Sequence, residues 1–218
     1  MPRLLRQIIC WAMLFQMANT ASLADGSISL QASRQPIRYD SEPVRAWRVL
    51  KQVSTIQCPP ESAEPDDPPT TSAIFDEKRF NAARYFKLDD SSRAEVRISW
   101  LGARFTRQFT NKIEPRSTVA KLRVFVLNRS SRSIGIAEEF RRTYELRLSD
   151  LWCLLKLQPG GEPGALLVDT QPNLFFVRNI NGELNVVDAL WSGNGWEIGA
   201  SPMTNNRPWP ARLRVIVH

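Results

Sequence analysis

The sequence predicts a mainly β protein: an antiparallel sandwich or a partly open barrel with one or two short helices. Two observations support this fold class. Apolar and polar residues alternate with a period of two in several short segments after residue 94, which is typical of strands with one buried face. Turn-forming residues then punctuate the last third of the chain, most strongly in QPGGEPG at 158–164.

The first 24 residues have the order of a secretory signal peptide. Arg3 and Arg6 precede an apolar run over residues 8–18, and small residues lead to Ala24, after which we expect cleavage. The run is much shorter than the roughly 20 residues that span a bilayer. We therefore expect an exported protein, secreted or periplasmic, whose mature chain of residues 25–218 forms a single mainly β domain without a transmembrane segment.

The first half of the mature chain contains few clear elements. Alternation in SISLQA predicts a first short strand, and residues 41–53 favour a helical turn followed by a strand, although a longer strand fits them too. Residues 59–70 hold five prolines and four acids, so we expect an extended acidic loop there. The best helix candidate is IFDEKRFNAARYFKL at 74–88, because Phe80 and Ala83 fall on one side of a helix.

Period-two segments follow at 94–100, 122–128 and 143–150, and each is expected to be a strand. The first of them places Trp100 on the same face as two aliphatic residues. We therefore expect Trp100 in the core.

Residues 165–218 form a hairpin-rich C-terminal portion that we expect to join the same sheet system. The dipeptide Asn181-Gly182 predicts a type I′ turn, because both residues tolerate positive φ angles. That turn would place Val177 opposite Val186.

The cysteines are few. Cys10 lies in the predicted signal peptide, which leaves Cys58 and Cys153 as the one pair in the mature chain. An exported protein meets an oxidising compartment, so we expect a disulfide between them. Two unpaired thiols are the alternative, because sequence does not show whether the two Cα atoms approach each other.

Basic residues concentrate in 93–147, which has 13 Lys or Arg against 5 Glu in a chain of net charge +7. Arg97 and Arg123 point away from the apolar faces of their predicted strands, and Lys121 lies two residues before Arg123. If these strands are neighbours, the three cations form a basic sheet face that attracts a polyanion. A solvated face that only keeps the protein soluble is the alternative.

Three tryptophans fall on predicted loops. Trp191 and Trp196 bracket the corner SGNG, and Trp209 lies in the Pro-rich segment NNRPWP. Exposed rings there would bind a glycan or a partner protein, since Trp is enriched at interface hot spots. Alternatively, Trp191 and Trp196 pair across a hairpin and stabilise it.

The histidine content of the sequence argues against several classes of catalytic and metal site. His218 is the only histidine, so the sequence argues against Ser-His-Asp and Cys-His catalysis and His-rich metal sites, and we expect no cofactor. Carboxylate chemistry needs no such motif. Asp188 interrupts the apolar strand LNVVDALW opposite Phe175, where burial would raise its pKa and suit it to act as an acid. Capping a backbone group is the alternative, and Glu197 is expected to be solvated.

These observations favour a non-catalytic exported binding protein that contacts a glycan, a polyanion or a partner protein through the basic sheet face and the Trp-bearing loops. A secreted interaction factor, such as an inhibitor or a host-directed effector, is one alternative, and a carboxylate-dependent hydrolase is another. Nucleic acid is not expected as a partner, because the protein is predicted to leave the cytosol.

Overall fold

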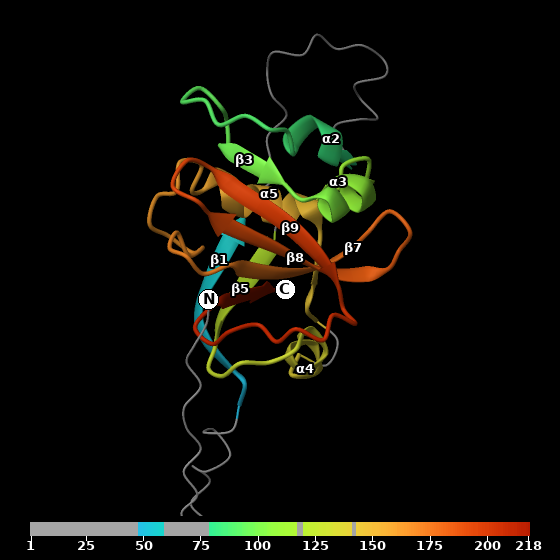
Figure 1. Ribbon diagram of the computed structural model, residues 1–218, viewed down its shortest axis with the longest axis vertical. Coiled ribbons are helices and arrows are strands. Elements are labelled where there is room, and N and C mark those ends of the chain that lie inside the picture. The colour runs from blue at the N-terminus through green and yellow to red at the C-terminus, as the bar shows by residue number, and fades with distance from the viewer. Residues whose placement is uncertain (1–47, 59–78, 117–119, 141–142) are drawn as a thin grey trace, which may run out of the picture. The chain divides into compact units, whose positions relative to one another are not determined.

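The computed structural model describes residues 48–58, 79–116, 120–140 and 143–218, which all belong to one unit spanning residues 41–218. The predicted signal peptide, the first predicted strand and the acidic loop at 59–70 lie outside the described residues. The described chain is mainly β, as predicted (Figure 1). Its strands are β1 (Leu50–Cys58), β2 (Arg79–Asn81), β3 (Ile98–Leu101), β4 (Ile113–Pro115), β5 (Ala120–Leu127), β6 (Glu145–Leu146), β7 (Asn173–Arg178), β8 (Leu184–Trp191), β9 (Trp196–Pro202) and β10 (Arg214–Val217). Its helices are α2 (Ala82–Tyr85), α3 (Ala103–Phe109), α4 (Ser133–Glu138) and α5 (Leu148–Lys156).

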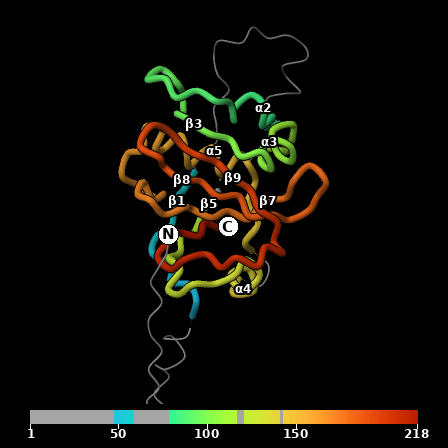
Figure 2. Tube along the Cα trace, in the orientation of Figure 1, coloured from blue at the N-terminus to red at the C-terminus, as the bar shows by residue number. Residues whose placement is uncertain are grey.

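Eight of the strands form one open sheet in the order β1-β5-β10-β7-β8-β9-β3, with β6 beside β7, and β2 pairs with β4 in a small second sheet. Strands β7, β8 and β9 follow one another in both the chain and the sheet (Figure 2). The sheet is mixed rather than purely antiparallel, because β10 and β6 run parallel to β7, and β3 runs parallel to β9. The described residues form four short helices, where the sequence predicted one or two.

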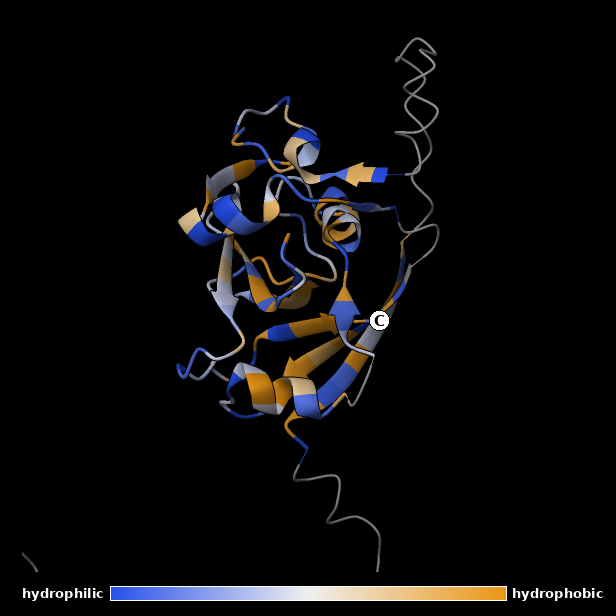
Figure 3. Ribbon diagram, turned by 90° about the vertical axis from the view of Figure 1, so that its right-hand side faces the viewer, coloured by the Kyte–Doolittle hydropathy of each residue, from blue (hydrophilic) through white to orange (hydrophobic). Residues whose placement is uncertain are grey.

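Both faces of the central strands are buried. Along β7, Phe175 and Val177 pack into a cluster with residues of α2, α3 and α5, whereas Leu174 and Phe176 pack into a cluster with residues of α4. We call these sides the α5 face and the α4 face. Figure 1 shows α5 and α4 on opposite sides of the sheet, and Figure 3 shows hydrophobic residues along the strands between them. The expectation of one buried face concerned the alternating segments at 94–100, 122–128 and 143–150; in β7 the unbroken apolar run LFFV reflects burial on both sides.

The helices differ from the expected ones. Within 74–88, Arg79–Asn81 is a strand, and helix α2 begins only after Asn81, whose side chain accepts a hydrogen bond from Ala83 N at 3.1 Å. The expected strand at 143–150 ends after Leu146. Helix α5 follows it because the Asp150 carboxylate accepts a hydrogen bond from Arg147 N at 2.8 Å, which caps the first turn.

The hairpin between β7 and β8 has a five-residue connection rather than a type I′ turn. Arg178 pairs with Leu184, and the Asn179 side-chain oxygen accepts hydrogen bonds from the main-chain N–H groups of Asn181 and Glu183, both at 2.9 Å. This side-chain contact organises the loop and shifts the predicted register by one residue. Val186 therefore lies opposite Phe176 instead of Val177, and Asp188 lies opposite Leu174 instead of Phe175.

The predicted disulfide between Cys58 and Cys153 is present, with the two Cα atoms 6.1 Å apart. It joins the end of β1, an edge strand of the sheet, to the middle of α5. The bond therefore ties the sheet to the helix that covers its α5 face. In the part of the chain that the structure describes, no helix is long and apolar enough to cross a membrane.

Candidate functional site

The three predicted cations do not share one surface. Lys121 and Arg123 lie on β5, whereas Arg97 immediately precedes β3, and β10, β7, β8 and β9 separate these two strands in the sheet. Arg97 instead contacts the segment after α5 and the end of β8: its Nη2 donates to the Gly160 carbonyl at 3.3 Å, and its guanidinium lies 5.6 Å from the centre of the Trp191 ring. The prediction that Arg97 joins the other two is therefore wrong, because it depended on strand adjacency.

Arg123 is linked to the start of α5 through His218 and Asp150. Arg123 donates from Nε to the His218 main-chain oxygen at 2.9 Å and from Nη2 to the Thr143 carbonyl at 3.2 Å. The His218 ring in turn lies 3.1 Å from the carboxylate of Asp150, which also accepts from Arg147 N. We call Lys121, Arg123 and Arg147 the basic cluster, with His218 as the link between strand and helix.

The described contacts of Arg123 and Arg147 are with oxygens of Thr143, His218, Pro115 and Arg116. Arg123 donates to main-chain oxygens and to the Thr143 hydroxyl, and Arg147 Nη1 donates to the carbonyls of Pro115 and Arg116 at 3.5 Å. Lys121 is exposed. The one described carboxylate that these contacts bring close, Asp150, is fully buried. Lys121 and Arg147 are the exposed basic side chains of the cluster.

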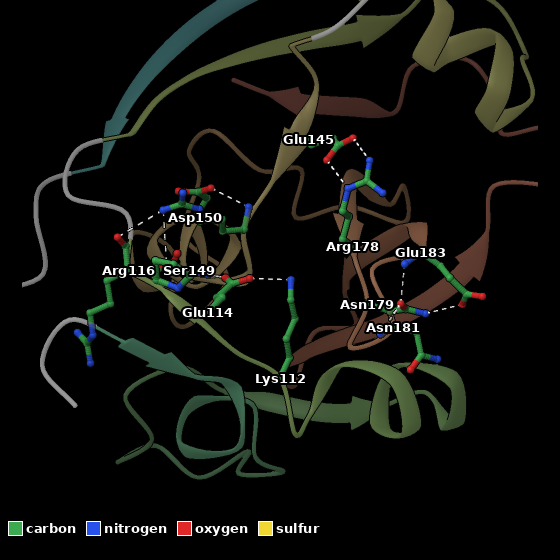
Figure 4. Close-up of polar contacts among 12 residues, drawn as sticks. Lys112, Glu114, Arg116, Glu145, Ser149, Asp150, Arg178, Asn179, Asn181 and Glu183 are labelled. Atoms are coloured by element: carbon green, nitrogen blue, oxygen red, sulfur yellow. Dashed lines mark hydrogen bonds and ion pairs between the residues drawn. The ribbon is translucent and has the colours of Figure 1, made fainter. Parts of the chain in front are cut away.

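Two buried carboxylates, Glu114 and Asp150, accept hydrogen bonds from main-chain N–H groups at the start of α5. Glu114 is buried, receives Lys112 Nζ at 2.7 Å and accepts a hydrogen bond from Ser149 N at 3.1 Å (Figure 4). Together with Asp150 it places negative charge at the N-terminus of α5, where free N–H groups favour it. Within the described residues, no hydroxyl or thiol forms a hydrogen bond with the His218 ring.

The three predicted loop tryptophans are used in packing. Trp191 and Trp196 are opposite each other on β8 and β9, with ring centres 5.5 Å apart, which agrees with the hairpin-stabilising alternative. Trp196 is fully buried and donates from Nε1 to the Gln158 carbonyl at 3.0 Å. Trp209 is half-buried and donates from Nε1 to Ser133 Oγ at 2.9 Å. Ligand binding by these rings stays a prediction that their contacts do not favour.

The tryptophan with a large exposed surface is Trp100, which was expected in the core. It is 50% exposed, whereas Val96 and Ile98 are buried. The pairing of β3 with β9 is irregular between Ile98 and Trp100, so the alternation of side chains breaks there. Trp100 then lies opposite Glu197 of β9, on the other face from Ile98.

Asp188 lies near Trp100 on this side of the sheet. Asp188 is opposite Gly199 of β9, and Glu197 is two residues away from Gly199 on the same face. Asp188 shares its face with Val186, which belongs to the α4 face. The side chains of Trp100, Asp188 and Glu197 therefore point to one side of β3, β8 and β9, and we call these three residues the Asp188 site.

Burial raises the pKa of Asp188 to about 6. Its own main-chain N–H offsets the effect only in part, and no neighbouring charge contributes. Within the described residues, neither Asp188 nor Glu197 forms an ion pair or a hydrogen bond with another side chain. Asp188 is thus a half-buried carboxylate without a compensating cation, which is uncommon outside functional sites.

The described residues include no group of three or more His, Cys, Asp or Glu side chains placed to hold a metal ion. Comparison with protein-family models, with curated proteins and with solved structures finds no match. The residues of the basic cluster and of the Asp188 site therefore supply the basis for inferring function.

Proposed function

We propose that this chain is a non-catalytic, exported binding protein whose ligand is an anionic polymer, such as a sulfated or carboxylated glycan, bound at the basic cluster. The observation that carries the proposal is that Lys121 and Arg123 lie two residues apart on β5, and that Arg123 is linked through His218 and Asp150 to the start of α5, where Arg147 lies. Positive charges attract polyanions and raise their rate of association.

The contacts of Arg123 and Arg147 support binding rather than only solubility. Both side chains are held by hydrogen bonds to main-chain oxygens, so part of the entropic cost of ordering them is met before a ligand arrives. Arg123 still has N–H groups that are not engaged in these contacts, and a guanidinium offers a planar fork to a sulfate or carboxylate.

Export is part of the proposal. The Cys58–Cys153 disulfide supports it, because structural disulfides persist mainly in oxidising compartments. N-terminal sequencing of the mature protein, purified from outside the cytosol, tests it. The expected first residue is Asp25, and an intact Met1 would contradict export by a cleaved signal.

Retention on immobilised heparin tests the ligand class. We expect the purified protein to be retained and to elute with salt. The double substitution Lys121→Glu and Arg147→Glu should lower the slope of log affinity against log salt by about two, one for each cation removed, by analogy with nucleic acid binding.

The matched control is Lys51→Glu on β1. Lys51 is exposed and lies six residues before Gln57, the partner of Lys121, which is about 20 Å along an extended strand. That separation exceeds the Debye length of about 8 Å at physiological salt. Lys121→Glu alone should therefore reduce retention more than Lys51→Glu does. Equal losses in these two single variants would show that net charge, not the basic cluster, causes retention.

A further inference from the structure

The sequence contains two Asn-Gly dipeptides, one in each of the consecutive hairpins β7–β8 and β8–β9. An asparagine followed by glycine is open to attack on its side chain, because glycine has no Cβ to hinder the approach of its main-chain nitrogen. Asn181 and Asn194 are both exposed, and within the described residues the side-chain amide of neither forms a hydrogen bond. The two sites differ in how the following peptide unit is held.

The peptide unit after Asn181 is fixed on both sides. The Gly182 N–H donates to the Asn179 carbonyl at 3.0 Å, and the Gly182 carbonyl accepts from Arg178 Nη1 at 2.7 Å. The Asn179 side-chain oxygen also accepts from the main-chain N–H groups of Asn181 and Glu183 (Figure 4). The nitrogen of Gly182 reaches the Asn181 side chain only after contacts of this loop break.

The peptide unit after Asn194 is held differently. Within the part of the chain that the structure describes, neither the Asn194 carbonyl nor the Gly195 N–H forms a hydrogen bond. Ser192 closes this corner instead, because its N–H and its hydroxyl both donate to the Gly195 carbonyl, at 3.1 and 3.0 Å. Rotation of the peptide unit that joins Asn194 to Gly195 therefore breaks no hydrogen bond.

The burial of Gly195 opposes this difference. Gly195 is buried, and a Cβ there would lie 2.8 Å from Ser99 N, whereas Gly182 is exposed. Burial slows the removal of the proton from the Gly195 nitrogen. The Asn181 loop, however, has to give up several hydrogen bonds, and each of them lowers the reactive population by roughly two- to tenfold. We expect the hydrogen bonds to decide.

We propose that Asn194 is a site of spontaneous deamidation through a cyclic imide. The Gly195 nitrogen loses its proton to base and attacks Cγ of Asn194. The new N–Cγ bond forms, the Cγ–Nδ2 bond breaks, and the side-chain nitrogen leaves as ammonia. Water then adds to either carbonyl of the imide and opens it to aspartate or to isoaspartate, so nothing is oxidised or reduced.

The products change the β8–β9 corner. Each adds a negative charge, and isoaspartate also lengthens the main chain of the corner by one methylene group. Trp191 and Trp196 lie opposite each other beside the corner, with ring centres 5.5 Å apart. The longer main chain should loosen this pair and lower the thermal stability. This modification is independent of polyanion binding, because Lys121 and Arg123 lie on β5.

The two asparagines are compared in one sample. The purified protein is incubated at mildly alkaline pH, either natively or in concentrated urea, and the peptides that contain Asn181 and Asn194 are followed by mass spectrometry. In urea both dipeptides lack structure and should react at similar rates. In the native protein we expect Asn194 to react roughly two- to tenfold faster than Asn181, relative to their rates in urea.

Two variants identify the causes. The longer side chain in Asn194→Gln disfavours ring closure, so the modification at this position should be lost while Asn181 reacts as before. Asn179→Ala removes the side-chain contacts that organise the β7–β8 loop. In this variant Asn181 should react faster, and the rate at Asn194 should not change.

The products distinguish the mechanisms. Aspartyl and isoaspartyl peptides elute separately, with Asn194→Asp as the reference for the first, and the presence of both supports the imide. Aspartate without isoaspartate would assign the loss of ammonia to direct hydrolysis and overturn the proposal. So would a native protein in which Asn181 reacts as fast as Asn194, relative to urea, or in which Asn194 reacts only in urea.

Discussion

Replacement of Asp188 by asparagine should stabilise the folded protein at neutral pH. The substitution keeps the size of the side chain and removes a charge that has no cation partner in the described structure. Burial raises the pKa of Asp188 from the ordinary value of 3.8 to about 6. At about 1.4 kcal/mol per pKa unit, the ionised carboxylate destabilises the folded state by about 3 kcal/mol at most. The side chain keeps some contact with water, so the gain in Asp188→Asn should lie between about 1 and 3 kcal/mol.

The pH dependence follows from the direction of this pKa change. Below pH 3.8 the carboxyl group is protonated in both the folded and the unfolded chain, so it does not penalise folding. As the pH rises, the unfolded chain releases its proton first, and the folded state loses relative stability until the folded pKa of about 6 is passed. The advantage of Asp188→Asn should thus be under about 1 kcal/mol at pH 4 and complete above pH 7.

Urea unfolding of both proteins at pH 4 and pH 7.5, followed by circular dichroism, measures this difference in the free energy of unfolding. Asp89→Asn is a control for which we expect the opposite change in the free energy of unfolding. Hydrogen bonds from Ser91 lower the pKa of Asp89 and stabilise its charged form. That variant should lose stability relative to the wild type as the pH rises. An Asp188→Asn protein that is no more stable than the wild type at pH 7.5, or equally stabilised at both pH values, would refute the reasoning.

Two further predictions concern stability. Replacing Cys58 and Cys153 by alanine should cost up to about 4–5 kcal/mol, because the bond links positions 95 residues apart; the urea midpoint of the double variant should fall to that of the reduced wild type. Gly161→Ala should cost clearly more than Gly193→Ala in thermal unfolding. Both glycines have positive φ, at 77° and 95°, which costs other residues about 1–2 kcal/mol. Only Gly161 would also place a Cβ within 2.1 Å of the Trp191 ring, so equal losses would mean that this ring moves aside freely.

Local patterns in the sequence identified several features of this protein. The mainly β class is confirmed, because short strands bounded by turn residues are visible in the order of residue types alone. The β8–β9 hairpin with its Trp191–Trp196 pair also follows from residues close together in the chain. The Cys58–Cys153 bond was predictable for another reason, since two cysteines allow one pairing.

Predictions from local sequence patterns were wrong where a single tertiary contact or an irregular strand pairing decided the register, the helix start or the face of a side chain. The register of the β7–β8 hairpin depends on the side chain of Asn179, which organises a longer loop than the dipeptide Asn181-Gly182 suggests. The start of α5 depends on the Asp150 carboxylate, although the residues before it alternate like a strand. Trp100 continues an alternating pattern, but an irregular pairing with β9 turns it to the opposite face.

By itself the sequence determined the mainly β class, which cysteines pair and which carboxylate interrupts an apolar strand, because these depend on residue type and near neighbours. Tertiary structure alone decided which strands lie side by side. It placed Arg97 on the Trp191 ring and away from Lys121, linked Arg123 through His218 and Asp150 to the start of α5, and brought Trp100 and Glu197 to the same face as Asp188. The physical reason is that strand order minimises the exposed apolar area of the whole sheet, and this total is not encoded in any one segment.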